Sequence, residues 1–484
     1  MYQKNIRKIF LFFIIPMIVW ILTYLFNSIF YSYLSSIIGF FLSSNFLIKL
    51  LKKNFKFKPL LTSSVLIIIF TNLSWMISSF FSFIFNQQNI FYNIELYLNI
   101  NPNNFIFSII YTYIFCIICL FLSFTKTNLK EEFKISFTIK KFKFYDLKKL
   151  LQINLIILII EIYLLSSDTL GYRRYNIEGY EEGIIKWYIP FLNYLIYFQI
   201  PLLIFIFNHY DKKKFAYLNL QLIVSICILL IIFFSKNRRD IVFLLLQFLF
   251  WFSIINQKIY IKKILFPVII LILVSFQATK YNNIIRYELY SQNFKNKSFL
   301  NIIKETIQSR NLKQLELDQY KKLKENLTFR PLTLSALTTL IEAPDDEKHF
   351  LLGKNIFNNL VWTVPRLIYP NKINTPIAEN LINENFRVNF QDIGQNLILL
   401  SYVDFSYLGL IIYPLLLYFF WIINLKVINS KNISDLVKIF MIASTFDIIL
   451  NSFEIATLTY FITLRNLLII FLIYKIFNVK SFKI

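Results

Sequence analysis

The sequence predicts an all-α fold: a polytopic integral membrane protein with about twelve transmembrane helices and one long helical loop outside the membrane. The first observation is composition, since hydrophobic residues make up 57%, charged residues only 16%, and mean hydropathy is +0.57. The second is the length of the apolar runs, because a helix of about twenty apolar residues crosses a bilayer. The third is that most of the net charge of +24 lies in short loops beside those runs. Such residues orient helices and contact anionic lipid, so we expect membrane lipid as a partner and no nucleic acid.

The apolar runs divide the chain into three regions. Residues 1–279 are a first membrane region, residues 280–395 an extracytoplasmic helical loop, and residues 396–484 a C-terminal membrane region. The expected spans of the first region are 9–26, 29–51, 60–85, 104–124, 150–166, 184–207, 215–234, 239–256 and 262–279. Those of the last region are 398–424, 436–452 and 458–478.

The basic residues of the loops predict that both termini are cytoplasmic. Loops at 49–58 and 126–149 are rich in lysine, whereas those at 86–103 and 451–457 contain no lysine or arginine. Basic loops remain on the cytoplasmic side. The segment Lys280–Gln395 is therefore expected on the outer face of a bacterial cytoplasmic membrane.

Two outer turns break this charge rule. Arg173 and Arg174 lie in a longer loop with several glutamates, where snorkelling to lipid phosphates is the simpler interpretation. Arg238 and Arg239 lie in a turn so short that both guanidinium groups must be at the membrane surface. Because the planar guanidinium pairs bidentately with phosphate oxygens, this second pair favours an anionic substrate.

The long loop is expected to be helical. Apolar residues recur at helical spacing over 299–327, which indicates an amphipathic helix on the membrane or against the spans. Shorter helices are expected at 332–343 and 355–369, with prolines at their ends or interrupting them. The run 364–372 (VPRLIYPNK) is the strongest local signal, since two prolines fix the backbone around two cations.

These features resemble the Wzy-type O-antigen polymerases, which join oligosaccharide repeat units. The resemblance rests on the topology, on Gly353-Lys354, and on Pro365-Arg366 followed by Pro370-Asn371-Lys372. Arg330 resembles a recurrent loop arginine, Ser235–Asp240 a short polar turn, and Tyr402–Phe405 with Gly409 the aromatic start of the next span. The chain departs from the family pattern at Leu400, where an acidic residue is common, and at Ser406, which replaces a usual glycine.

The resemblance implies a GT-C-like glycosyltransferase that joins undecaprenyl-diphosphate-linked oligosaccharide units into a surface polysaccharide such as O-antigen or capsule. A flippase and a chain-length regulator are then expected partners. The leaving group is an anionic pyrophosphate, which fixed cations would stabilise. The expected substrate-binding residues are Arg238, Arg239, Arg330, Arg366, Lys372 and Tyr402. The acceptor hydroxyl needs a base, and the candidate catalytic residues are Asp404, Asp392 and His349, with Glu342 also available.

Two other functions remain open at this point. An O-antigen-ligase-like glycosyltransferase would share the spans and the long outer loop, and sequence does not separate it from a polymerase. A lipid-linked glycan flippase should carry charges through its central spans and lack a large outer segment, and this chain shows the reverse. Motifs typical of metal, nucleotide and serine-hydrolase sites do not occur in the sequence. We therefore expect neither a metal nor a cofactor.

Overall fold

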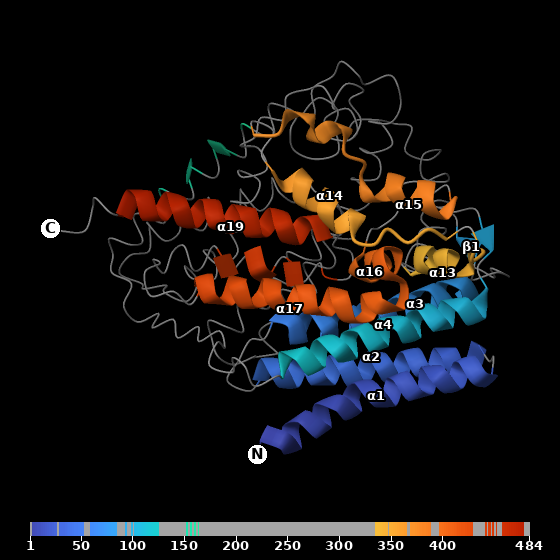
Figure 1. Cartoon of the computed structure of the whole chain (residues 1–484). Coiled ribbons are helices and arrows are strands. Elements are labelled where there is room, and N and C mark those ends of the chain that lie inside the picture. The colour runs from blue at the N-terminus through green and yellow to red at the C-terminus, as the bar shows by residue number, and fades with distance from the viewer. Residues whose placement is uncertain are drawn as a thin grey trace, which may run out of the picture. The chain divides into compact units, whose positions relative to one another are not determined.

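The computed structural model divides the chain into two compact units, which are treated separately. The first comprises Met1–Lys134, Tyr320–Ile433 and Ile448–Ile484, and the second Ile135–Gln319 and Ser434–Asp447. The structure describes residues 2–26, 29–52, 59–84, 92–93, 98–99, 101–124, 334–346, 348–364, 368–388, 396–428 and 457–478, with scattered residues in 152–163 and 441–452. All the elements named below belong to the first unit (Figure 1).

Four long helices form the N-terminal part of this unit. They are α1 (Tyr2–Phe26), α2 (Ile29–Lys52), α3 (Pro59–Ile84) and α4 (Pro102–Ser123). The predicted helices at 29–51, 60–85 and 104–124 are thus confirmed, and α1 begins earlier than the predicted residue 9. Helix α2 packs against α1 and α3, and α4 packs against α1 and α3. Between α3 and α4, β1 (Tyr92–Asn93) pairs antiparallel with β2 (Leu98–Asn99).

A chain of buried polar groups joins these helices. Trp20 Nε1 donates to Asn72 Oδ1 at 3.2 Å, and Asn72 Nδ2 donates to Tyr113 Oη at 2.7 Å. Gly39 of α2 makes room for both partners, because a Cβ at this position would overlap Asn72 and lie 2.5 Å from Tyr113 Oη. Small residues and interhelical hydrogen bonds are the means by which helices associate where lipid removes the hydrophobic driving force.

Several helices of the described part have the length and apolarity of membrane spans. They are the segments Tyr31–Ile48, Pro59–Ser78, Asn103–Ser123 and Leu397–Ile428, and a shorter apolar stretch covers Leu11–Phe26. The described residues are mostly helical, as the sequence predicts, and these helices are compatible with a membrane protein. The number of spans, their orientation and the three-region division stay predictions. Most of the spans predicted between 150 and 279 fall outside the described residues.

The described part of the predicted outer loop contains three α-helices and one 3₁₀ turn. They are α13 (Ser335–Glu342), α14 (Lys354–Thr363), η7 (Pro370–Asn374) and α15 (Ala378–Phe386). The prediction of a helix over 355–369 is too long, because α14 ends at Thr363 and Val364 is extended with ψ 131°. A residue before proline avoids the helical region, and Pro365 follows Val364. The helix expected at 299–327 lies outside the described residues.

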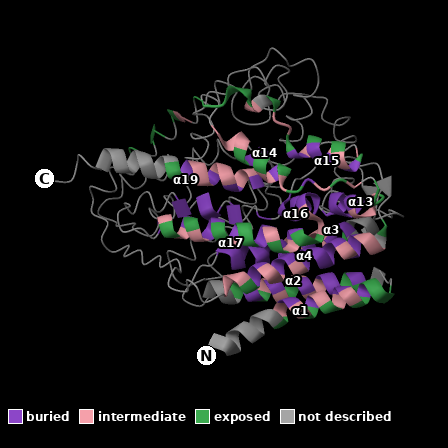
Figure 2. Ribbon diagram, viewed as in Figure 1, coloured by how far each residue is buried: buried purple, intermediate pink, exposed green. Residues whose placement is uncertain are grey.

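These shorter helices pack against long ones. Helix α13 contacts α4, and α14 contacts α19 (Thr457–Asn478), which confirms the helix predicted at 458–478. Figure 2 shows buried residues concentrated on α3, α4, α13 and α16 (Leu397–Phe405).

The predicted single span 398–424 is interrupted, which is a correction. Helix α16 ends at Phe405, a 3₁₀ turn η8 covers Ser406–Leu408, and α17 runs over Gly409–Ile428. Ser406 has φ 52° and ψ −132°, a conformation that glycine adopts without strain and other residues rarely adopt. Gly409 is required at the start of α17, since a Cβ there would overlap the carbonyl oxygen of Ser401. The chain therefore turns sharply where the sequence suggested one helix.

Candidate functional site

The structure describes four of the nine candidate site residues of the sequence: Asp404, His349, Lys372 and Tyr402. The other five, Arg238, Arg239, Arg330, Arg366 and Asp392, lie outside the described residues. The roles expected for these five residues therefore stay predictions. Asp404, Lys372 and Tyr402 lie at the ends of α14 and α16, whereas His349 lies in the segment between α13 and α14.

Asp404 lies at the end of α16, where its carboxyl group is fully buried. Its Oδ2 atom accepts a 2.6 Å hydrogen bond from the hydroxyl of Tyr413 on α17. The carboxyl group also interacts with the backbone N–H groups of Asn355 and Ile356. The Oδ1 atom makes no hydrogen bond of ordinary geometry to a described residue. The contact with these N–H groups is therefore an electrostatic attraction.

This carboxyl group takes the place of a helix cap for α14. The first N–H groups of a helix have no partner within the helix. The N-cap residue of α14 is Gly353, which has φ 88° and no side chain to accept from them. Asp404 supplies a negative charge from another helix, which is favourable at the positive end of the helix dipole. Backbone bonds hold the two segments together, from Leu351 N to Val403 O at 3.1 Å and from Leu352 N to Asp404 O at 2.8 Å.

Two cations lie at the opposite end of α14. Lys372 Nζ donates to the carbonyl oxygens of Trp362 at 3.1 Å and Val364 at 2.7 Å. Arg465 of α19 donates from Nη1 to the carbonyl oxygen of Thr363 at 2.9 Å. Cations are favourable at the negative end of a helix dipole. Asp404, Lys372 and Arg465 together are called the α14 clamp below.

Buried polar side chains link the clamp to the neighbouring helices. Asn355 Nδ2 approaches the Tyr413 hydroxyl at 3.4 Å, and Asn359 Nδ2 donates to Asn355 Oδ1 at 3.2 Å. Asn359 Nδ2 also donates to Thr457 Oγ1 at 2.7 Å, at the start of α19. All of these residues are buried. The network therefore joins α14, α16, α17 and α19 around one acidic residue.

Sequence reasoning missed the neutral members of this network. Asn355, Asn358 and Asn359 share one face of α14, and all three are buried. Their spacing of three and four residues marks one helix face. It could have been recognised in the sequence as a polar face turned toward protein.

Tyr402 belongs to an aromatic cluster and is buried, with 2% of its surface exposed. Its ring makes edge contacts with Tyr111, Phe350 and Tyr407, with centroid distances of 5.9, 5.7 and 6.1 Å. Phe350 in turn contacts Phe386 of α15 at 5.7 Å. Rings packed in this way stabilise a core. The geometry favours a role for Tyr402 in joining α4, α15 and α16.

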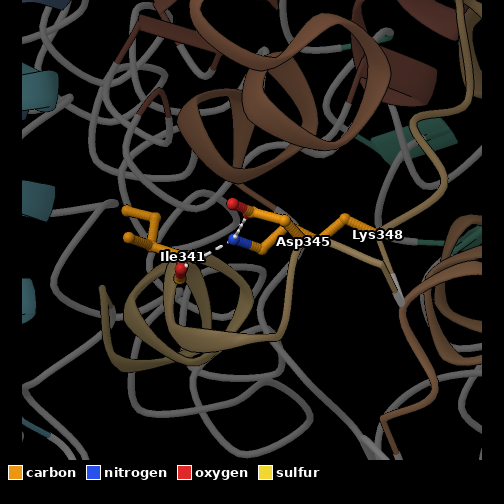
Figure 3. A network of polar contacts seen from close by, with 3 residues as sticks. All are labelled: Ile341, Asp345 and Lys348. Carbon is orange, nitrogen blue, oxygen red and sulfur yellow. Dashed lines mark hydrogen bonds and ion pairs between the residues drawn. The ribbon is translucent and has the colours of Figure 1, made fainter.

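The other candidate bases lie around α13. Glu342 Oε1 accepts from the backbone N–H of Asn101 at 2.7 Å and from Asn104 Nδ2 at 3.2 Å, at the start of α4. Lys348 Nζ donates to the carbonyl oxygen of Ile341 at 3.0 Å and pairs with Asp345 at 2.9 Å (Figure 3). Glu342 therefore holds the start of α4, and Lys348 holds the end of α13.

The adjacent His349 donates from its backbone N–H to Asn385 O at 3.1 Å, and its side chain is exposed. No described contact links His349 to the α14 clamp.

Within the described residues, no group of three or more His, Cys, Asp or Glu residues could hold a metal ion. Comparison with protein-family models, with curated proteins and with solved structures finds no match to this chain.

Proposed function

We propose that this chain is a membrane-embedded glycosyltransferase that joins polyprenyl-diphosphate-linked oligosaccharide units into a surface polysaccharide on the outer face of the bacterial cytoplasmic membrane. The proposal rests on the resemblance of the segment 364–372 to the Wzy-type polymerases. One observation carries it further: cations from two distant stretches of chain meet directly before the Pro365-Arg366 element. Lys372 and Arg465 contact the carbonyl oxygens of Trp362, Thr363 and Val364.

The chemistry of the proposed donor explains why cations are useful at this place. When the glycosidic bond to the growing chain forms, the bond between the sugar and the polyprenyl diphosphate breaks, and the diphosphate leaves with negative charge. Cations already held in position stabilise that charge without reorganisation. A guanidinium group has five N–H groups. Arg465 donates three hydrogen bonds from this group, one to Thr363 and two to Asn466. The remaining two contact no described residue and are free to bind phosphate oxygens.

The roles of the other residues follow from this assignment. Arg366 is proposed to bind the diphosphate beside Arg465, with Arg238, Arg239 and Arg330 as further contacts. Asp392 and His349 are proposed as candidate bases for the acceptor hydroxyl. Asp404 is buried at the far end of α14 from the two cations. We therefore propose Asp404 as a residue that positions α14, and less as the base itself.

The test replaces cations in cells whose surface polysaccharide depends on this chain. Arg465→Gln and Arg366→Lys should each reduce the amount of long glycan at least tenfold, because loss of one stabilising donor costs about 10²–10³ in rate in other enzymes. The readout is the glycan ladder, with protein abundance measured in the same membranes. Lys426→Gln is the matched control, since this exposed cation lies in the last turn of α17, where no substrate contact is proposed.

Normal ladders from both variants at normal abundance would exclude the assignment. Analysis of the product distinguishes a polymerase from a ligase. A polymerase leaves the lengthened glycan on the polyprenyl carrier, whereas a ligase transfers it to another acceptor.

A further inference from the structure

Helix α14 buries polar side chains and exposes apolar ones, the reverse of a helix on the surface of a soluble protein. Its asparagines at 355, 358 and 359 are buried, with at most 7% of their surface exposed. Two of its large apolar side chains face outward, since Phe357 is 65% and Leu360 43% exposed. Exposed apolar groups are unfavourable in water. A helix with this arrangement is typical of an apolar environment on its outer side.

The apolar surface extends beyond α14 along the chain. Leu352, directly before the helix, is 79% exposed and has φ 49°, a left-handed conformation unusual for leucine. The bond from Leu352 N to Asp404 O holds the backbone in this conformation and turns the side chain outward. After the helix, Ile368 is 74% exposed. Together, Leu352, Phe357, Leu360 and Ile368 are called the α14 apolar face.

This face begins beside a helix that has the length and apolarity of a membrane span. Gly353 lies against the ring of Phe405, at the end of α16. The next residues along that chain include Leu408 of η8, which is 65% exposed, and lead into α17, whose side chains Ile411 and Phe419 are 52% and 58% exposed. The segment Leu397–Ile428 that contains them is a candidate span. Lipid around α17 would therefore reach the start of α14.

From these observations we infer that the α14 apolar face lies in the bilayer, at the boundary between headgroups and acyl chains of one leaflet. Helix α14 has ten residues, which is about 15 Å of helix and too short to cross a hydrocarbon layer of about 30 Å. The exposed Lys354, one turn from Phe357, can reach headgroup phosphates while the apolar side chains contact acyl chains. The partner is the lipid bilayer itself, and the inference does not depend on the proposed enzymatic function.

Fluorescence quenching in nanodiscs tests the inference. Single cysteines at Phe357→Cys and Leu360→Cys carry an environment-sensitive NBD label, in full-length protein whose cysteines at 116, 119 and 227 are replaced by alanine. Phosphatidylcholine with a doxyl group at acyl carbon 5 probes the boundary region, and iodide probes the water. Asp346→Cys is the aqueous control because it lies in an exposed polar turn, and Phe419→Cys on α17 is the acyl-chain control.

We expect the labels at 357 and 360 to be quenched at least twofold more by the doxyl lipid than the label at 346, and at least twofold less by iodide. Iodide quenching equal to that at 346 would place the face in water. Protection from both quenchers would place a protein segment over it, and either result would overturn the inference. Leu352→Cys supplies an independent measurement if a label on α14 prevents folding, which size-exclusion chromatography would reveal.

Discussion

Replacement of Asp404 should destabilise the fold in a way that can be calculated from its contacts. In Asp404→Ala, α14 loses the negative charge at its positive end, which costs about 0.3–1 kcal/mol. The Tyr413 hydroxyl, which is 1% exposed, loses the acceptor at 2.6 Å. A buried polar group without a partner costs about 1–3 kcal/mol. We therefore expect the free energy of unfolding to fall by about 1–4 kcal/mol.

The conservative change Asp404→Asn should cost much less. Its amide oxygen can still accept the hydrogen bond from the Tyr413 hydroxyl. What is lost is the negative charge at the positive end of α14, worth about 0.3–1 kcal/mol. The order of stability should therefore be wild type, Asp404→Asn and then Asp404→Ala.

A double-mutant cycle isolates the contact between Asp404 and Tyr413. Hydrogen bonds between membrane helices average about 0.6 kcal/mol, with a maximum near 1.7. Because the acceptor is a carboxyl group, we expect a coupling of about 1–1.5 kcal/mol between Asp404→Ala and Tyr413→Phe. The free energy of unfolding is measured by steric trapping in bicelles. Tyr407→Phe, at a tyrosine that is 57% exposed nearby, should change it by less than about 0.5 kcal/mol. An Asp404→Ala variant as stable as wild type, with no coupling to Tyr413, would refute the reasoning.

Two further predictions concern the backbone. Ser406→Gly should stabilise the protein by about 1 kcal/mol. It removes about 1–3 kcal/mol of strain at φ 52°, and the greater entropy of glycine in the unfolded state offsets about 0.5–1 kcal/mol of this gain. Unfolding under the same conditions measures the change, and a less stable variant would contradict it. Gly39→Ala should destabilise by about 1–3 kcal/mol, because its methyl group overlaps Asn72 and crowds Tyr113. If the alanine variant unfolds like wild type, the close approach of α2 to α3 and α4 is incorrect.

The sequence predicted the long helices well and the interruption poorly, for physical reasons. A single segment that crosses lipid must satisfy its own backbone hydrogen bonds, and an α-helix does this. Helices α2, α3 and α4 therefore begin and end close to the predicted residues. The turn at Ser406 has no local signal, because a serine there adopts a backbone conformation typical of glycine. The one indication of this turn was that the Wzy-type polymerases, which the sequence resembles, usually have a glycine at the position of Ser406.

The role of Lys372 as a phosphate contact stays a prediction. The structure adds that its ammonium group donates to the carbonyl oxygens of Trp362 and Val364. Such a contact depends on where the chain returns after Pro370, which residue spacing does not determine. The buried asparagines of α14 were missed because polar residues are usually assigned to solvent, and this assumption fails for a short helix with protein on one side and lipid on the other.

Asp404 has two candidate roles, as a general base and as a residue that positions α14. The geometry of the α14 clamp gives each role a different expected result. The carboxyl group contacts one end of a ten-residue helix, and Lys372 and Arg465 contact the other end. A general base acts through its own proton transfer, so Asp404→Asn would abolish polymer synthesis while the protein stays folded. A residue that positions α14 acts through the helix, so activity should fall in the same order as stability, with Asp404→Asn close to wild type and Asp404→Ala impaired. Because the asparagine variant keeps the acceptor and removes the base, its glycan ladder alone distinguishes the two roles.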